Sequence, residues 1–243
     1  MKVGTDGVLL GAWAEGGSRI LDIGAGTGLI SLMMAQRFPE AQVVGIDIDA
    51  DACQQARENA AASPFADRVV MECCALQELG VRSEELGVRS EELGVRSEEL
   101  GVGSEELGVA SGMLFDAIVS NPPFFVNSMK NPDSKRSLAR HTDSLPFPVL
   151  MKGVKRWLSD DGVFSAIVPA EVVEQFVSEA YCSGLLLARK CGVKTVERKQ
   201  PKRYLLAFRK RRLSALEEEI KTMTDSQGNR SSWYAKITEE FYL

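Results

Sequence analysis

The segment Ile20–Ile30, Ile-Leu-Asp-Ile-Gly-Ala-Gly-Thr-Gly-Leu-Ile, constrains the fold of this chain more than any other part of it. Its apolar beginning is typical of a buried strand, predicted at 19–22, and its glycines lead into a predicted helix at 29–38. Glycines let the backbone come close to a ligand, and a helix N-terminus favours negative charge. A strand, a glycine turn and a helix in this order therefore predict a ligand-binding loop.

The residues around these glycines narrow the kind of ligand. No Gly-Lys-Ser/Thr follows the loop, so a nucleoside triphosphate is not expected. Asp22 would repel a pyrophosphate, whereas it suits a positively charged amino group. The next predicted strand, 42–47, ends in Asp47, which can accept hydrogen bonds from ribose hydroxyls. An amino acid joined to a ribose describes S-adenosylmethionine, and its contacts are predicted at Asp22, Gly24, Ala25, Gly26, Thr27, Gly28, Asp47 and Ile48.

Predicted strands and helices alternate along most of the chain. The strands are predicted at 19–22, 42–47, 68–73, 115–120, 162–168, 186–191 and 204–209, and the helices at 29–38, 50–62, 148–158 and 171–182. Such alternation predicts an α/β fold with a doubly wound, mainly parallel sheet of seven strands, the last two antiparallel to each other. Ligands bind at the carboxyl ends of such strands, so the glycine loop, Asp47 and Asn121 are expected to share one pocket. The segment 212–230 is compatible with a helix or with an edge strand.

Residues 78–112 are five copies of a seven-residue unit, Glu-Leu-Gly-Val-Arg-Ser-Glu, with changes in the last two. A coiled coil is not expected, because Leu and Val within the unit would lie on nearly opposite faces of a helix. The glycine in each unit costs close to 1 kcal/mol of helix propensity. We therefore predict a flexible or weakly structured insert between the third and fourth strands, without a catalytic role.

A second motif, Asn121-Pro122-Pro123-Phe124, follows the predicted strand at 115–120. The side-chain carbonyl of Asn121 and the backbone carbonyl of Pro122 can both accept hydrogen bonds from one exocyclic amino group. The two prolines fix φ, so these acceptors are ordered before binding. Phe124 offers a flat face on which a base can stack. These four residues are the predicted catalytic residues for transfer of a group to a planar amino nitrogen.

The composition excludes several classes of function. With 243 residues, 44% of them apolar, the chain can bury one substantial core, and a single domain over 1–243 is expected. No apolar run reaches membrane-spanning length and no export signal begins the chain, so a cytoplasmic protein without a membrane partner is predicted. The five cysteines form no CxxC pair, which argues against a zinc site. His141 is the lone histidine, so a histidine triad and a multi-histidine metal centre are not expected.

The two motifs together resemble class I S-adenosylmethionine-dependent amino-methyltransferases. The opening residues 1–13, Met-Lys-Val-Gly-Thr-Asp-Gly-Val-Leu-Leu-Gly-Ala-Trp, resemble more specifically the bacterial tRNA1(Val) adenine-N6-methyltransferase family. Ala139-Arg140-His141 and the ending from Tyr234 to Leu243 are similar to the same family. The resemblance covers nearly the whole chain except the insert. It implies a Rossmann-like methyltransferase sheet whose final strand is antiparallel.

The resemblance also implies a reaction. A methyl group would pass from S-adenosylmethionine to N6 of the adenine beside the anticodon of tRNA1(Val), without a metal. Thr5 and Asp6 would lie over the methionine end of the cofactor. Ala75 stands where the family usually has an acid that binds the adenine amino group of the cofactor, and the loss of one such bond costs about 0.5–1.5 kcal/mol. Met1 directly begins the signature, where relatives carry an upstream segment, so the domain is expected to be N-terminally short.

The net charge of −5 does not exclude RNA, because the distribution of charge matters more than its sum. Basic residues gather directly after the catalytic tetrad and again between 194 and 212. Contacts with the tRNA are predicted at Lys135, Arg136, Arg140 and His141. The protein is expected to act as a monomer.

Three alternatives stay open at this point. A protein-glutamine N5-methyltransferase acting on a release factor would use the same acceptors, although the extra N-terminal helical domain of such enzymes is missing here. A DNA adenine methyltransferase would need a target-recognition domain, for which no residues are left. An inactive homologue that only binds S-adenosylmethionine is the third alternative, because the insert, Ala75 and the N-terminus depart from the family.

Overall fold

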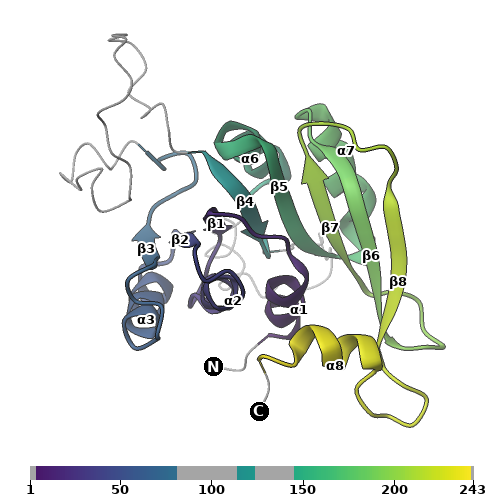
Figure 1. Cartoon of the computed structure of the whole chain (residues 1–243). Coiled ribbons are helices and arrows are strands. Elements are labelled where there is room, and N and C mark those ends of the chain that lie inside the picture. The colour runs from purple at the N-terminus through teal and green to yellow at the C-terminus, as the bar shows by residue number, and fades with distance from the viewer. Residues whose placement is uncertain (1–3, 81–113, 124–144, 242–243) are drawn as a thin grey trace, which may run out of the picture.

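The computed structural model describes residues 4–80, 114–123 and 145–241, and these residues form one eight-stranded sheet with helices on both faces (Figure 1). The strand order is β3-β2-β1-β4-β5-β7-β6-β8. The strands are β1 Arg19–Ile23, β2 Gln42–Asp47, β3 Val69–Cys73, β4 Phe115–Ser120, β5 Leu158–Pro169, β6 Leu186–Val196, β7 Arg203–Arg209 and β8 Glu217–Thr224. The helices are α1 Thr5–Trp13, α2 Leu29–Arg37, α3 Ala50–Ala61, α6 Phe147–Trp157, α7 Val173–Cys182 and α8 Ser232–Thr238, with a 3-10 turn at Ala170–Val172.

The two larger hydrophobic cores lie on the two faces of the sheet. One holds buried residues of α1, α2, α3 and α8, among them Leu10, Met34 and Tyr234. The other holds residues of α6 and α7, among them Trp157 and Phe176. Because both faces are covered, the central strands are continuous apolar runs rather than alternating ones. The predicted α/β fold with a doubly wound, mainly parallel sheet is confirmed.

The parallel half of the sheet positions the site. β1 pairs in parallel with β2 on one side and with β4 on the other. The chain leaves β1 towards α2 and β2, and it leaves β4 towards α6 and β5, so the strand order reverses between β1 and β4. A crevice opens beyond the carboxyl ends of two strands that diverge in this way.

The other half of the sheet is antiparallel in part. β7 is antiparallel to both β5 and β6, as the final strand of the predicted seven. β8 is an eighth strand, which pairs in parallel with β6, so the part of the segment 212–230 from Glu217 to Thr224 is an edge strand. Its residues are exposed or half-buried, so no apolar periodicity marks it in the sequence. Pairing with β6 therefore decides its conformation.

Helix α1 was not among the predicted elements. Its residues from Gly7 to Trp13 are all buried, because α1 lies against α2, α8 and the sheet. A Cβ at Gly11 would lie 2.8 Å from Sδ of Met33, so this glycine allows the close approach of α2. A helix that is apolar on all sides lacks the one-sided stripe by which helices are predicted.

The beginning of the predicted insert belongs to the packed domain. Leu79 is buried in the same core as Trp157. Gly80 has a φ of +88°, and a Cβ there would lie 2.8 Å from the Trp157 ring. The rest of the predicted insert, 81–112, lies outside the described residues.

Candidate active site

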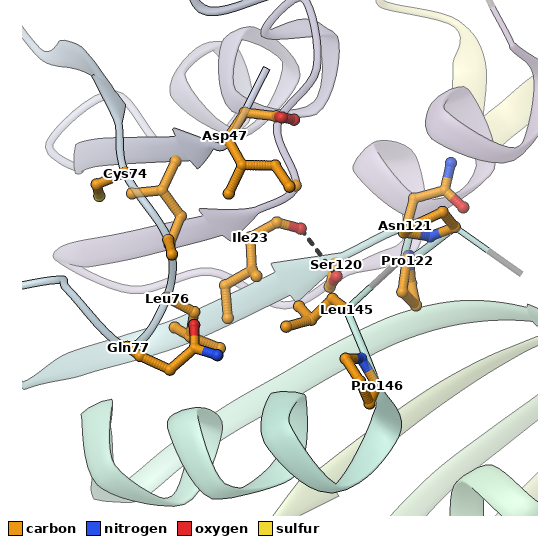
Figure 2. A pocket seen from close by; sticks show the side chains of 15 residues that line it. Ile23, Asp47, Cys74, Leu76, Gln77, Ser120, Asn121, Pro122, Leu145 and Pro146 are labelled. Atoms are coloured by element: carbon orange, nitrogen blue, oxygen red, sulfur yellow. Dashed lines mark hydrogen bonds between the residues drawn. The ribbon is translucent and has the colours of Figure 1, made fainter. Parts of the chain in front are cut away.

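A cavity of about 440 Å³ opens at the carboxyl ends of β1, β2, β3 and β4 (Figure 2). Its walls come from four strand ends and from the residues before α6. They are Ile23, Gly24, Ile46, Asp47, Ile48, Cys74, Ala75, Leu76, Gln77, Ser120, Asn121, Pro122, Pro123, Leu145 and Pro146. Most of these side chains are apolar, and the polar ones are few, as in pockets that hold small organic ligands.

The glycine loop leads from the cavity to α2. Gly24 and Gly26 have φ values of +73° and +55°, which L side chains rarely adopt. A Cβ at either glycine would meet no atom within 4 Å, so open space lies beside the loop. The amides of Gly24 and Ala25 donate to the backbone oxygen of Ile46, at 2.9 and 3.0 Å, and thereby hold the loop against β2. The remaining predicted loop residues, Thr27 and Gly28, lie at the start of α2, where Gly28 is the N-cap residue.

Asp47 joins the glycine loop to the loop after β2. Its Oδ2 accepts from the amide of Gly26 at 2.8 Å, and its Oδ1 accepts from the amide of Asp49 at 3.0 Å. A carboxylate has about four acceptor sites, so both oxygens keep capacity for a further donor. Ile48 follows with a relative exposure of 51%, so a large apolar side chain lies at the cavity.

Asp22 lies fully buried in β1 and is not part of the cavity wall. The hydroxyl of Ser31 donates to its Oδ2 at 2.7 Å. Its Oδ1 is buried and has no hydrogen-bond partner among the described residues. Burial raises the pKa of this carboxyl from its ordinary 3.8 to about 7, against the smaller effect of the Ser31 hydrogen bonds, which lower it. A buried acceptor without a partner is a position at which a bound amino group would be stabilised.

The raised pKa of Asp22 predicts a specific pH dependence of stability. The unfolded chain loses the Asp22 proton near pH 3.8, whereas the folded chain keeps it to about pH 7. Stability is therefore lost as the pH rises through this window, by up to about 4 kcal/mol at about 1.36 kcal/mol per pKa unit. In urea denaturation between pH 4 and 8, the wild type is expected to lose stability relative to Asp22→Asn. A difference between the two proteins that does not change with pH would contradict the assignment.

Asn121, Pro122 and Pro123 follow β4 and line the cavity. Figure 2 shows the side chain of Asn121 beside Pro122, with Ser120 between Asn121 and Leu145. Three of the four predicted catalytic residues and Asp47 therefore share one cavity, although 74 positions separate Asp47 and Asn121 in the chain (121 − 47). Phe124 lies outside the described residues.

The predicted residues near the N-terminus lie elsewhere. Thr5 and Asp6 begin α1, and neither lines the cavity. Asp6 forms an ion pair with Arg203 of β7, at 2.7 Å between Oδ1 and the guanidinium. The predicted contact of Thr5 and Asp6 with the cofactor stays a prediction. The predicted RNA contacts Lys135, Arg136, Arg140 and His141 lie in the segment 124–144, which the structure does not describe.

Several wall residues were not predicted from the sequence. Ala75 lines the cavity as expected, but so does Gln77, whose amide can donate and accept hydrogen bonds. Ser120 is buried, and its hydroxyl donates to the backbone oxygen of Ile23 at 2.8 Å. Leu145 and Pro146 reach the cavity from the start of α6. None of these residues belongs to a motif, so only the juxtaposition of chain segments reveals them.

Neither a metal centre nor a membrane span is found in the part of the chain that the structure describes. No three His, Cys, Asp or Glu residues in it lie close enough together to hold a metal ion. None of its helices is both long and apolar enough to cross a bilayer.

Comparison with known proteins identifies the fold and the family of the chain. Residues 14–88 match the family described as "Methyltransferase domain". The crystal structure of a predicted O-methyltransferase from Agrobacterium tumefaciens superposes with a TM-score of 0.63 at 15% identity, over 97% of this chain and 96% of that one, and shows the same fold. A tRNA1(Val) (adenine(37)-N6)-methyltransferase from Phocaeicola vulgatus is 43% identical, and one from Bacteroides fragilis is 40% identical, each over 100% of this chain and 91% of the relative. The chain belongs to the tRNA1(Val) (adenine(37)-N6)-methyltransferase family, as its opening residues and its two motifs predicted.

Proposed function

We propose that this protein transfers the methyl group of S-adenosylmethionine to N6 of adenine 37, beside the anticodon of tRNA1(Val). The observation that carries the proposal is the shared cavity of Asn121 and Asp47. This cavity combines acceptors for a planar amino group with an acceptor for ribose hydroxyls. The names of the 43% and 40% identical relatives support the same substrate.

The residues of the site fit S-adenosylmethionine. The open space beside Gly24 and Gly26 would admit the methionine part of the cofactor. Asp22 does not line the cavity, so the contact of its unpartnered Oδ1 with the cofactor's amino group stays a prediction. Asp47 would accept from the ribose hydroxyls, while Ile48 and apolar side chains deeper in the cavity would lie against the adenine ring. Bound in this way, the cofactor supplies an electrophilic methyl group on a positively charged sulfur.

Asn121 and Pro122 would orient the accepting amine. The Asn121 side-chain oxygen and the Pro122 backbone oxygen would each accept one hydrogen bond from the N6 amino group. The prolines restrict the backbone that carries both acceptors, so less conformational entropy is lost on binding. Orientation of two reactants in this way can supply several kcal/mol of the barrier, about 7–11 kcal/mol in the best aligned cases.

Ala75 removes one polar contact expected for the cofactor adenine. Gln77, on the same segment, lines the cavity and offers an amide. The loss of one neutral hydrogen bond corresponds to about 0.5–1.5 kcal/mol, so weaker but measurable cofactor binding is expected.

Purified protein, S-adenosylmethionine and unmodified tRNA1(Val) transcript test the proposal. Nucleoside mass analysis should detect N6-methyladenine at position 37, and a transcript with guanine at that position should remain unmethylated. A release factor serves as the competing acceptor. Methylglutamine in the release factor, with no product in the tRNA, would reject the proposal in favour of protein methylation. Cofactor binding with transfer to neither acceptor would indicate an inactive homologue.

A further inference from the structure

The turn between β6 and β7 projects from the same edge of the sheet as the active site. Ser120 is paired with Ala166 of β5, and Ala166 is paired with Leu206 of β7, so these three residues lie at one level. Lys202 lies four positions before Leu206, towards the edge where Asn121 lies. At about 3.3 Å per residue and about 4.8 Å between strands, Lys202 is roughly 15 Å from Asn121.

This turn carries three exposed cations, Arg198, Lys199 and Lys202. No carboxylate among the described residues lies within ion-pair distance of them. Several basic side chains of β6 and β7 are paired: Arg189 and Arg209 with Glu15, Lys190 with Glu218, and Arg203 with Asp6. After β7, Lys210 pairs with Asp160 and Arg211 with Asp161. In a chain of net charge −5, three unpaired cations at one turn form a local positive surface.

Backbone hydrogen bonds hold the turn between β6 and β7 in place. The amide of Lys199 donates to the oxygen of Val196 at 3.1 Å, and the amide of Lys202 donates to the oxygen of Val193 at 3.2 Å. Pro201 further restricts the backbone between them. The three cations are therefore attached to a fixed frame, which lowers the entropy lost when they bind an extended anion.

We propose that Arg198, Lys199 and Lys202 form a phosphate-binding surface for the RNA substrate. This inference rests on the proposed function and names a contact region distinct from the segment after Asn121. An adenine bound at Asn121 would bring the phosphates of its neighbouring nucleotides to the edge of the sheet where these three cations lie. These contacts position the RNA without reading its sequence.

The test compares two triple variants with equal changes in charge. Arg198→Gln/Lys199→Gln/Lys202→Gln removes the surface, while Lys210→Gln/Arg211→Gln/Arg212→Gln removes three cations at the opposite edge of the sheet. Binding of tRNA1(Val) transcript is measured by fluorescence anisotropy at several salt concentrations. Each lost phosphate contact is expected to reduce the magnitude of the slope of log K against log salt by about 0.7–0.9. The variant of the turn should therefore lose about 2–3 in the magnitude of the slope. The variant at the opposite edge should keep the wild-type slope.

The outcomes separate this inference from the proposed function. Equal slopes in the two variants and the wild type, with tRNA methylation intact, would overturn the inference alone. Equal losses in both variants would also overturn it, since net charge would then explain the effect. A wild-type protein that neither binds nor methylates tRNA would contradict the proposed function and the inference with it.

A different observation carries a second inference, about Ser120. This buried serine lies where β1 and β4 diverge, directly before Asn121, and its hydroxyl donates to Ile23, directly before Gly24 (Figure 2). The geometry points to Ser120 as a positioning residue, which sets the spacing between the glycine loop and Asn121. A shift of about 1 Å between reacting groups can cost about a hundredfold in rate.

Ser165 offers a matched control for Ser120. It is buried on the neighbouring strand β5, beside Val119, and its hydroxyl has no partner among the described residues. Ser120→Ala is expected to lower the single-turnover rate of methyl transfer about 10–100-fold, with unchanged affinity for S-adenosylmethionine, and Ser120→Thr should restore it. Ser165→Ala should leave the rate unchanged. An unchanged rate in Ser120→Ala, or a loss confined to cofactor affinity, would overturn the positioning role.

Discussion

Replacing Asn121 with alanine is expected to stop methyl transfer while the affinity for S-adenosylmethionine stays within a few-fold of the wild type. Asn121 follows β4 and lies at the cavity beside Pro122, where its side chain can accept from the substrate amine. Removal of a single preorganised polar group from an active site costs about 100–1,000-fold in rate. Single-turnover transfer to tRNA1(Val) transcript and calorimetry with the cofactor measure the two quantities separately.

The conservative variant Asn121→Asp controls for the shape of the side chain. It keeps an acceptor oxygen at the same position, so it should retain more activity than Asn121→Ala. A collapse of cofactor affinity together with activity in Asn121→Ala would mean that Asn121 acts on the cofactor and not on the substrate amine.

Replacing Asp47 with alanine is expected to weaken S-adenosylmethionine binding by about 2–3 kcal/mol, or about 30–150-fold in Kd. The variant loses the proposed acceptor of the ribose hydroxyls. It also loses the acceptor of the Gly26 amide, which fixes the glycine loop at 2.8 Å from Asp47. Calorimetric titration with the cofactor measures the change.

Asp49 provides the control for Asp47. Its carboxylate accepts from the amides of Asp51 and Ala52 and caps α3. Asp49→Ala should therefore cost about 1 kcal/mol of stability while cofactor affinity is kept. If Asp47→Ala lowers the melting temperature as Asp49→Ala does but leaves cofactor affinity unchanged, Asp47 has only a structural role.

The central strands could be predicted from the sequence almost residue by residue. β2 and β4 have the predicted limits, and β1 ends one residue later than predicted, at Ile23. These strands are buried on both faces, so each is an apolar run that ends in a polar or turn residue. β8 and α1 could not be predicted in the same way. Tertiary contacts, and not a local apolar pattern, determine both of them.

The site, like the fold, contains residues that could be predicted from the sequence and residues that could not. The motif residues Asp47 and Asn121 were predicted because a short stretch of sequence around each one indicates its chemical role. Gln77 and Ser120 could not be found in this way, since they matter only where their strand ends meet others. Asp22 was predicted as a ligand residue, but the sequence does not indicate that its carboxyl is buried with a pKa of about 7. That property depends on the helix packed over it.

The cavity is confined to one half of the sheet, and this has an evolutionary consequence. Every described residue of the cavity wall comes from β1, β2, β3 or β4, from the segments that follow them, or from the segment before α6. The half formed by β6, β7 and β8 contributes none of them, so mutations there escape selection for cofactor affinity. Changes in β6, β7 and their turn could thus alter how firmly the RNA is held, while Asp47 and the proposed amine acceptors Asn121 and Pro122 are inherited unchanged. A chimaera of paralogues joined after β5 is therefore expected to keep the cofactor affinity of the parent that supplies β1 to β5.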